Sequence, residues 1–172
     1  TKLDIVEWQL RIAAGEPLTF SQKDVSLNGH SVEARVYPED STTSLPTIGT
    51  VKELKQPSGS KVRIDGSLFN GYEILPHYDA LMAKVITWGE TREKAISTLS
   101  KALGEYHISG VTTNIPLVQR ALSHPEFTSG TYSTQILSHL DGPTKEDPNR
   151  GAESEVIAAI LAVLWTTFNT RA

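Results

Sequence analysis

The residues of this chain that could do chemistry begin with a strand-like stretch at residues 28–40, which reads NGHSVEARVYPED. Side chains alternate between the two faces of a strand, so Glu33, Arg35 and Tyr37 share one face and small apolar residues fill most of the other. A guanidinium is planar and permanently charged, which suits Arg35 to holding an oxyanion. On the residues alone, the simpler interpretation is a solvated charged surface whose pairs each contribute roughly a few tenths of a kcal/mol.

A second polar group, made of His77, Tyr78 and Asp79, stands directly before an apolar stretch. Its simpler interpretation is a turn in which the Asp79 carboxylate accepts hydrogen bonds from backbone N–H groups. The sequence has no glycine-rich phosphate loop, no GxSxG nucleophile motif and no histidine pair at positions i and i+4. Its five histidines are scattered, so no metal site is expected.

Composition argues against several kinds of partner. The net charge is −4, which does not suit a protein that binds nucleic acid or an anionic membrane, and neither partner is expected. Cysteine is absent, which excludes disulfides, thiolate nucleophiles and zinc–sulfur sites. The apolar run at residues 156–165 is too short to cross a bilayer, which takes about 20 residues. Because Thr1 leads almost directly into a helical pattern, we expect the chain to be a piece of a longer protein.

Patterning predicts how the N-terminal half is organised. Apolar spacing predicts a helix over residues 3–13, with Gly15 just after its end. Residues 24–37 alternate, and the pair Asn28-Gly29 predicts a turn between two short strands.

The middle of the chain is expected to form most of a sheet. Short β-type runs occupy residues 50–56, 60–65, 72–76 and 80–89, separated by segments rich in glycine, serine and proline. Spacing of this kind predicts an antiparallel sheet of meandering hairpins.

Helices are expected after this sheet. Thr91 is placed as the N-cap of a helix that ends near residue 106 and has one apolar side, formed by Ala95, Ile96, Leu99, Ala102 and Leu103. A short strand or turn and then a helix from Asn114 or Ile115 should follow, with Pro116 in its first turn. Residues 133–140 predict a last short helix. The fold class is therefore α+β, an antiparallel sheet meander flanked by helices, with a C-terminal helical appendage.

The C-terminal tail has a different composition. Residues 1–140 are expected to form one domain, and residues 141–155 are polar and read as a linker. Residues 156–172 are expected to begin a helical interaction segment, because an apolar run without a clear polar face needs burial on more than one side. The alternative is a helix that packs on its own domain.

Five separated motifs together carry a family resemblance over residues 1–140. They read LDIVEWQLRIAAGEPL, NGHSVEARVYPED, LPTIGTV, VRIDGSLFNGYEILPHYDALMAKVITWGETREKAI and GVTTNIPLVQRALSHPEF. In this order, they resemble the C-terminal region of biotin carboxylases, the ATP-grasp components of biotin-dependent carboxylases. The residues of these motifs are most similar to those of the acyl-CoA carboxylase branch. This resemblance implies a part in the ATP- and bicarbonate-dependent carboxylation of biotin.

The resemblance also implies roles for single residues. Arg35 matches the arginine that stabilises the biotin ureido oxyanion, and Glu33 belongs to the same strand motif. Tyr78 and Asp79 match a Tyr-Asp pair beside the biotin pocket, where Asp79 either orients Arg35 or closes the biotin entrance. Thr134 matches a position near the adenine of ATP.

Three positions bear on assembly and packing. Arg63 matches an arginine used at the dimer interface of bacterial biotin carboxylases. Ser60 stands where those enzymes have the accompanying aromatic residue, which puts a simple two-fold dimer in doubt. Ser44 replaces an aromatic residue in a loop of the family, so the packing of that loop is expected to differ.

The resemblance further implies that the active site is incomplete within this chain. The ATP lid, the metal-binding glutamates, the bicarbonate ligands and the general base belong to the N-terminal ATP-grasp part, so ATP and Mg would be bound mainly there. Expected partners are that part, a biotin carboxyl carrier domain, a carboxyltransferase subunit and a second protomer, in the cytoplasm or, in a eukaryote, the mitochondrial matrix. The alternative is a non-catalytic subunit-assembly module that docks a carboxyltransferase or a second protomer.

Overall fold

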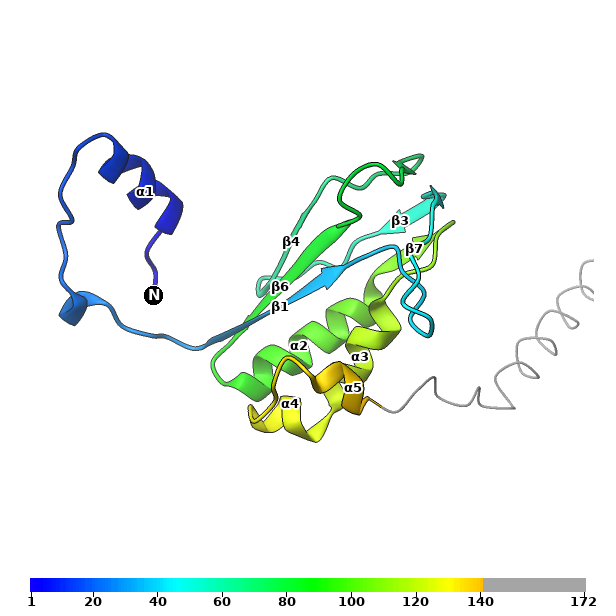
Figure 1. Ribbon diagram of the computed structural model, residues 1–172. Coiled ribbons are helices and arrows are strands. Elements are labelled where there is room, and N and C mark those ends of the chain that lie inside the picture. Colours follow the sequence, from blue (N-terminus) through cyan, green and yellow to red (C-terminus); the bar gives the residue numbers. More distant parts are fainter. Residues whose placement is uncertain (141–172) are drawn as a thin grey trace, which may run out of the picture.

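The chain begins with a helix that stands apart from the rest of the molecule in the computed structural model, which describes residues 1–140 (Figure 1). Helix α1 spans Ile5–Ala13, and the Asp4 side chain caps it by accepting the Glu7 N–H. Gly15 follows the helix with φ near +90°, a conformation that glycine adopts readily. The predicted first helix and its end are confirmed.

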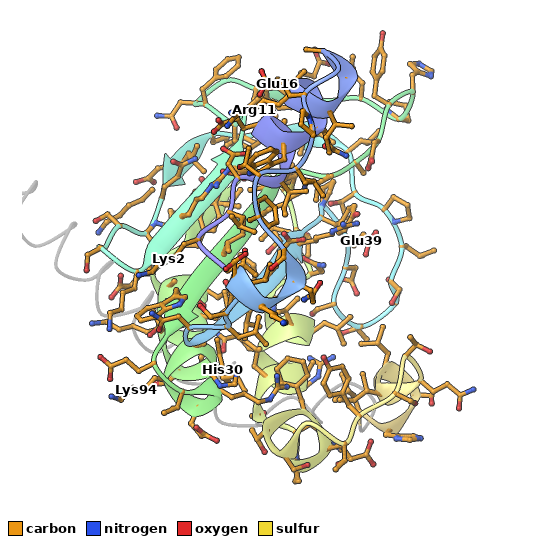
Figure 2. All side chains as sticks on the ribbon, turned by 90° about the vertical axis from the view of Figure 1, so that its left-hand side faces the viewer. Lys2, Arg11, Glu16, His30, Glu39 and Lys94 are labelled. Atoms are coloured by element: carbon orange, nitrogen blue, oxygen red, sulfur yellow. The ribbon has the colours of Figure 1, made fainter. Side chains whose placement is uncertain are left out.

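Helix α1 leaves its apolar side chains exposed. Arg11 Nε donates to Glu16 Oε2 at 2.8 Å, and the two residues lie side by side near the end of the helix (Figure 2). The large apolar side chains that stay at least half exposed in this segment are Ile5, Val6, Leu10, Ile12 and Leu18. Within the described residues, the core is therefore built without α1.

The segment after α1 corrects one sequence-based expectation. Residues 24–37 do not form two strands around an Asn28-Gly29 turn: a short 3-10 helix, η1 (Gln22–Asp24), precedes one strand, β1 (His30–Val36). Alternation alone cannot supply a partner strand, and β1 pairs instead with β6 (Ala83–Gly89), whose paired residues are 47 to 59 positions away in the sequence. The predicted hairpin is wrong.

The main sheet has three antiparallel strands in the order β1-β6-β4, where β4 is Val62–Gly66. Two separate two-stranded antiparallel sheets are formed by β2 (Gly49–Thr50) with β5 (Glu73–Ile74), and by β3 (Glu53–Lys55) with β7 (His107–Ser109). The α+β class with antiparallel sheets is confirmed. Strands adjacent in the main sheet are not consecutive in the chain, so the strand order differs from a simple meander. The long, largely buried β6 takes a neighbour on each edge.

One face of this sheet is covered by helix α2 (Arg92–Glu105), whose N-cap Thr91 accepts the Lys94 N–H as predicted (Figure 1). All five residues of its predicted apolar side are buried. The buried Thr87 hydroxyl donates to the Ala95 carbonyl at 2.9 Å and so ties β6 to the first turn of α2. The main core consists of Ala34, Val36, Ala83, Val85, Ile96, Leu99, Ala102, Leu103, Tyr106 and Leu122.

Three more helices lie beside α2: α3 (Ile115–Ser123), α4 (Pro125–Ser129) and α5 (Ile136–His139) (Figure 1). The predicted helix with Pro116 in its first turn and the predicted last short helix are confirmed. The sequence reading missed α4, a single turn whose start is capped by the His124 ring accepting the Glu126 N–H. The predicted linker and interaction segment, residues 141–172, lie outside the described residues. No helix among residues 1–140 is long and apolar enough to cross a membrane.

Candidate functional site

The face of the main sheet opposite α2 carries rows of charged side chains. The register sets Arg35 of β1 opposite Lys84 of β6, and Lys84 opposite Asp65 of β4, so the three form one rung across the sheet. A second rung lies two positions away along the strands. It begins with Glu33 on β1 and ends with Arg63 on β4. These five charges, three positive and two negative, define what we call the open face.

Arg35 stands on the open face with one carboxylate beside it. Its Nε lies 3.2 Å from Glu33 Oε1, and its side chain is 60% exposed. The hydrogen bond that Arg35 donates to Glu33, and to a lesser degree its interaction with the Tyr37 phenol, raises the pKa of Arg35. The guanidinium therefore keeps its charge throughout the working pH range, and the Glu33 contact uses one of its five N–H groups.

The other arginine of the open face is held by a fork of two hydrogen bonds. Arg63 Nε and Nη2 donate to the two carboxylate oxygens of Asp65 at 2.7 and 2.9 Å. This contact with Arg63, followed by the charge of Lys84, holds the pKa of Asp65 below its usual value. Asp65 thus stays ionised between two cations, and Arg63 is engaged within its own strand.

Tyr78 and Asp79 lie in the segment between β5 and β6. The Asp79 carboxylate accepts the Leu81 N–H at 3.0 Å, so the interpretation of this group as a turn with a side-chain acceptor is confirmed. Both residues line a hollow of about 210 Å³ together with apolar side chains that include Ile74 and Met82. Tyr78 is 78% exposed.

The two polar groups singled out in the sequence meet at the same end of the main sheet. The Met82 N–H donates to the Val36 carbonyl at 2.9 Å, next to Arg35 along β1 and three residues after Asp79. The carboxylate in contact with Arg35 is nevertheless Glu33, whereas Asp79 binds its own turn. The fold brings the groups near each other without making Asp79 an ion-pair partner.

Thr134 is not brought to the open face. It lies exposed in the turn before α5, among the helices beside α2. Because α2 covers the sheet face opposite Arg35, Thr134 and Arg35 lie on different sides of the sheet. The structure assigns it no contact with the open face.

The two serines for which the resemblance implied an aromatic residue in the family, Ser44 and Ser60, occupy distinct settings. Ser44 has φ near +56°, a left-handed conformation that bulky residues adopt rarely, and its N–H donates to the Asp40 carbonyl at 2.8 Å. Ser60 lines a shallow hollow of about 210 Å³ beside α2.

Asn114 is the residue near this site that sequence reasoning treated only as a helix start. It is buried, with 8% of its surface exposed. Its Oδ1 accepts the Tyr37 N–H at 3.0 Å, and its Nδ2 donates to the Arg35 carbonyl at 3.1 Å. An Asn before Ile-Pro is typical of a helix N-cap, which is why its contact with β1 could not be read from the sequence.

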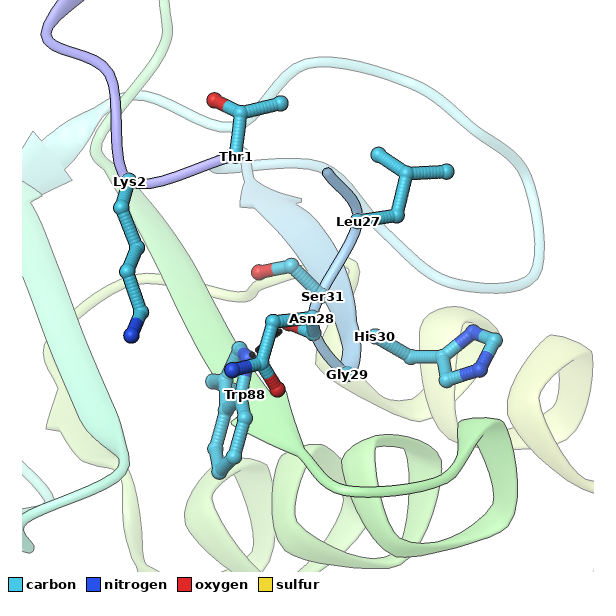
Figure 3. Close-up of a pocket in the computed structure, with 8 residues that line it drawn as sticks. All are labelled: Thr1, Lys2, Leu27, Asn28, Gly29, His30, Ser31 and Trp88. Carbon is cyan, nitrogen blue, oxygen red and sulfur yellow. Dashed lines mark hydrogen bonds between the residues drawn. The ribbon is translucent and has the colours of Figure 1, made fainter. Parts of the chain in front are cut away.

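A larger hollow, of about 460 Å³, lies at the other end of β1. Lys2, Gly29 and Trp88 are among its lining residues (Figure 3). The Trp88 indole N–H donates to the Asn28 carbonyl at 3.1 Å, and Gly29 has φ near +70° directly against the Trp88 ring. The lining has no carboxylate and contains none of the predicted site residues. In residues 1–140, no three His, Asp or Glu side chains are grouped to hold a metal ion.

Comparison with known proteins decides the family. The family model described as the biotin carboxylase C-terminal domain matches residues 33–139. This chain belongs to that family. The match includes all the strands of the main sheet except the first three residues of β1, and it contains both polar groups.

The most similar relatives include a biotin carboxylase of Halalkalibacterium halodurans, 40% identical over 149 residues, which cover 86% of this chain and 33% of that relative. The α subunit of mouse mitochondrial methylcrotonoyl-CoA carboxylase is 40% identical over 166 residues, covering 95% of this chain and 23% of that subunit. The chain thus spans a third or less of these curated relatives.

Solved structures share this fold. The biotin carboxylase domain of Hydrogenobacter thermophilus 2-oxoglutarate carboxylase, a dimer solved with MgADP, ADP and bicarbonate, has a TM-score of 0.77 and 42% identity. The match covers 81% of this chain and 31% of that domain. A complete pyruvate carboxylase of Rhizobium etli has a TM-score of 0.80 and 32% identity, over 86% of this chain and 16% of that enzyme.

Proposed function

We propose that this chain supplies the oxyanion-stabilising arginine of a biotin carboxylase, and that Arg35 is this residue. The observation that carries the proposal is the position of Arg35 on the open face, in the same rung as Lys84 and paired with Glu33 through Nε. Neighbouring residues of an antiparallel rung lie about 5 Å apart, and the three cations and two carboxylates of the open face leave one net positive charge there in an acidic chain. Such a site suits a small anion.

Stabilising the ureido oxyanion of biotin requires a cation that does not itself transfer a proton. In the proposed reaction, ATP and bicarbonate give ADP and carboxyphosphate, which breaks down to CO2 and phosphate. A base takes the proton of the biotin ureido nitrogen, and this nitrogen then forms a bond to the carbon of CO2, which becomes the carboxylate. Negative charge is greatest on the ureido oxygen once that nitrogen has lost its proton. Arg35 would donate an N–H to this oxygen, and Glu33 would hold the guanidinium by its Nε. A pKa raised by Glu33 keeps Arg35 a donor throughout.

Tyr78 and Asp79 are proposed to border the biotin pocket. Their segment lies at the end of the sheet where Arg35 stands, and both line the hollow beside Met82. Since Asp79 binds its own turn, closing the biotin entrance fits it better than orienting Arg35. Thr134 is proposed to lie near the adenine of ATP, among the helices beside α2.

The remaining components of the reaction are proposed to come from other parts of the enzyme. An N-terminal ATP-grasp part would bind most of ATP and Mg and provide the bicarbonate ligands and the base. A carrier domain would present biotin, and a carboxyltransferase subunit would use the carboxybiotin. The expected location is the cytoplasm, or the mitochondrial matrix in a eukaryote.

A chimeric carboxylase tests this proposal. In it, residues 1–140 replace the matching region of the H. halodurans biotin carboxylase. We expect the chimera to carboxylate biotin and Arg35→Ala to lower kcat by about 10²–10³-fold, on the scale of losing one oxyanion donor. Arg11→Ala, which removes a partly exposed arginine of α1 outside the main sheet, is the control and should leave kcat unchanged. A folded but inactive chimera, or full activity in Arg35→Ala, would contradict the proposed function.

The isolated 172-residue chain provides a second test. Without the ATP-grasp part, it should show neither biotin carboxylation nor bicarbonate-dependent ATP hydrolysis. Either activity in the purified chain, measured as phosphate release with and without bicarbonate, would show that the site is complete within it.

The exposed apolar side of α1 favours one further candidate, a subunit-assembly module. Ile5, Val6 and Leu10 are 61%, 64% and 68% exposed, which is unfavourable unless another surface covers them. Arg63 on the open face would add a polar contact with a second protomer. The assembly reading predicts that changing Val6 and Leu10 to serine abolishes co-purification with a separately expressed ATP-grasp part, a carboxyltransferase or a second copy, while biotin chemistry is unaffected by Arg35→Ala.

A further inference from the structure

The carboxamide of Asn114 binds the backbone of β1 on both sides of one residue. Its Nδ2 donates to the Arg35 carbonyl at 3.1 Å, and its Oδ1 accepts the Tyr37 N–H at 3.0 Å. The Asn114 backbone N–H also donates to the Tyr37 carbonyl at 3.1 Å. Val36, which lies between the bound groups, is fully buried in the main core.

The Asn114 side chain makes the hydrogen bonds that a neighbouring strand would otherwise make with this edge of β1. β1 is an edge strand, because the order of the main sheet is β1-β6-β4. Val36 directs its carbonyl toward β6, where it accepts the Met82 N–H, while the Arg35 carbonyl and the Tyr37 N–H meet Asn114. A neutral amide has both a donor and an acceptor, so one side chain satisfies both groups.

The usual local role of an asparagine at this position is not the one observed. An N-cap side chain accepts a backbone N–H from the first turn of its own helix. Asn114 precedes α3, yet its side chain makes no such hydrogen bond and is directed to β1 instead. The buried amide therefore serves the strand that carries Arg35.

We propose that Asn114 is a positioning residue for Arg35, a role that rests on the proposed function of Arg35 itself. The direct side-chain partner of Arg35 is Glu33, and this exposed pair is too weak to hold the guanidinium in one place. The direction of the Arg35 side chain is set mainly by its backbone, and that backbone is held by Asn114 from one edge and β6 from the other.

Helix α3 also binds the segment that follows β1. Arg120 of α3 donates through Nη2 to the Ser41 carbonyl at 3.0 Å. Asn114 and Arg120 thus fix the end of β1 and the following loop to one helix. A displacement of α3 is transmitted directly to Arg35, and misplacing a catalytic group by about 1 Å can lower a rate by about 10²-fold.

The test uses the chimeric carboxylase and a matched control on the same helix. Gln119 also makes two side-chain hydrogen bonds, to the hydroxyl and the carbonyl of Ser100 at 2.7 Å each, but these reach α2 rather than β1. Asn114→Ala should lower kcat for biotin carboxylation by about 10–10²-fold. It should leave bicarbonate-dependent ATP hydrolysis without biotin within about two-fold. Gln119→Ala should change neither rate by more than about two-fold.

Two further variants separate positioning from folding. Asn114→Asp keeps the acceptor for the Tyr37 N–H but turns a carboxylate oxygen toward the Arg35 carbonyl, so it should lose carboxylation as Asn114→Ala does, in a side chain of nearly the same shape. In an Arg35→Ala background, Asn114→Ala should lower kcat no further, because a residue that acts only through Arg35 has no effect once that side chain is gone.

The outcomes distinguish this proposal from the function on which it rests. If Arg35→Ala leaves carboxylation unchanged, the proposed function fails and the positioning role with it. If Arg35→Ala lowers carboxylation but both Asn114 variants behave like Gln119→Ala, the positioning role alone is overturned. It is equally overturned if the Asn114 variants lower carboxylation and biotin-independent ATP hydrolysis by the same factor, or add fully to Arg35→Ala.

Discussion

The side-chain amide of Asn114 lies 3.1 Å from the carbonyl oxygen of Arg35, although 79 positions separate the two residues. This hydrogen bond joins the helical layer to the strand that carries the open face. The geometry of the candidate site therefore depends on helix α3 as well as on the strand motif. The predictions that follow concern the guanidinium, the core, the backbone and the charges of this arrangement.

Replacing Arg35 by lysine should not preserve activity. A lysine keeps the charge but lacks the planar fork and the Nε contact with Glu33. We expect Arg35→Lys to lower kcat of the chimeric carboxylase by at least about ten-fold. The free energy of unfolding should stay within about 0.5 kcal/mol of the parent, since the side chain is exposed. Steady-state carboxylation and urea unfolding measure the two effects; equal activity would mean that charge alone is sufficient.

The core prediction compares two leucines. Leu99 is fully buried against the sheet, whereas Leu10 of α1 is 68% exposed. Leu99→Ala should lower the free energy of unfolding of the 172-residue chain by about 2–5 kcal/mol, because it removes buried methyl groups and leaves a cavity. Leu10→Ala should change it by less than about 0.5 kcal/mol. Similar losses in urea unfolding would mean that α1 is packed in the isolated chain.

Two glycines should respond to alanine in opposite directions. At Gly89, an added Cβ would clash with the Ala95 backbone nitrogen, so Gly89→Ala forces β6 away from α2 and should strongly destabilise the chain. Gly104 lies near the end of α2 with nothing closer than 4.0 Å to an added Cβ. Gly104→Ala should therefore stabilise the chain by about 0.5–1 kcal/mol through helix propensity. Thermal unfolding midpoints of the two variants should lie on either side of the parent.

The Arg63–Asp65 pair gives a pH dependence in the acid range. Hydrogen bonding from Arg63, then the charge of Lys84, lowers the pKa of Asp65 in the folded chain. The unfolded chain binds the proton first, so this pair contributes stability above the unfolded pKa of about 4, and the contribution is lost as pH falls through the lower folded pKa. Asp65→Asn should therefore reduce the unfolding midpoint at pH 6 more than at pH 2.5.

Arg63→Ala is the companion to this measurement. It removes the main cause of the lowered pKa, so it should weaken the same part of the pH dependence, leaving what Lys84 supplies. Parallel pH profiles for the parent and both variants would show that the pair does not couple to folding.

The alternation of residues 30–37 predicted which side chains share a face, and the structure places Glu33 and Arg35 outward with Ala34 and Val36 buried. Helix α2 could also be predicted from the sequence, because a capping threonine and a 3.6-residue apolar period are local properties. The family motifs pointed to Arg35, Tyr78 and Asp79 as the candidate site.

Tertiary structure decided the rest. An alternating pattern states that a strand has two faces but not which strand pairs with it, so the pairing of β1 with β6 and the absence of a hairpin at residues 24–37 followed only from the fold. Short-range rules likewise indicated only that a helix begins at Asn114 or Ile115. The Asn114 side chain reaches Arg35 because the strand edge, which needs a donor and an acceptor, lies beside it in space and 79 positions away in sequence.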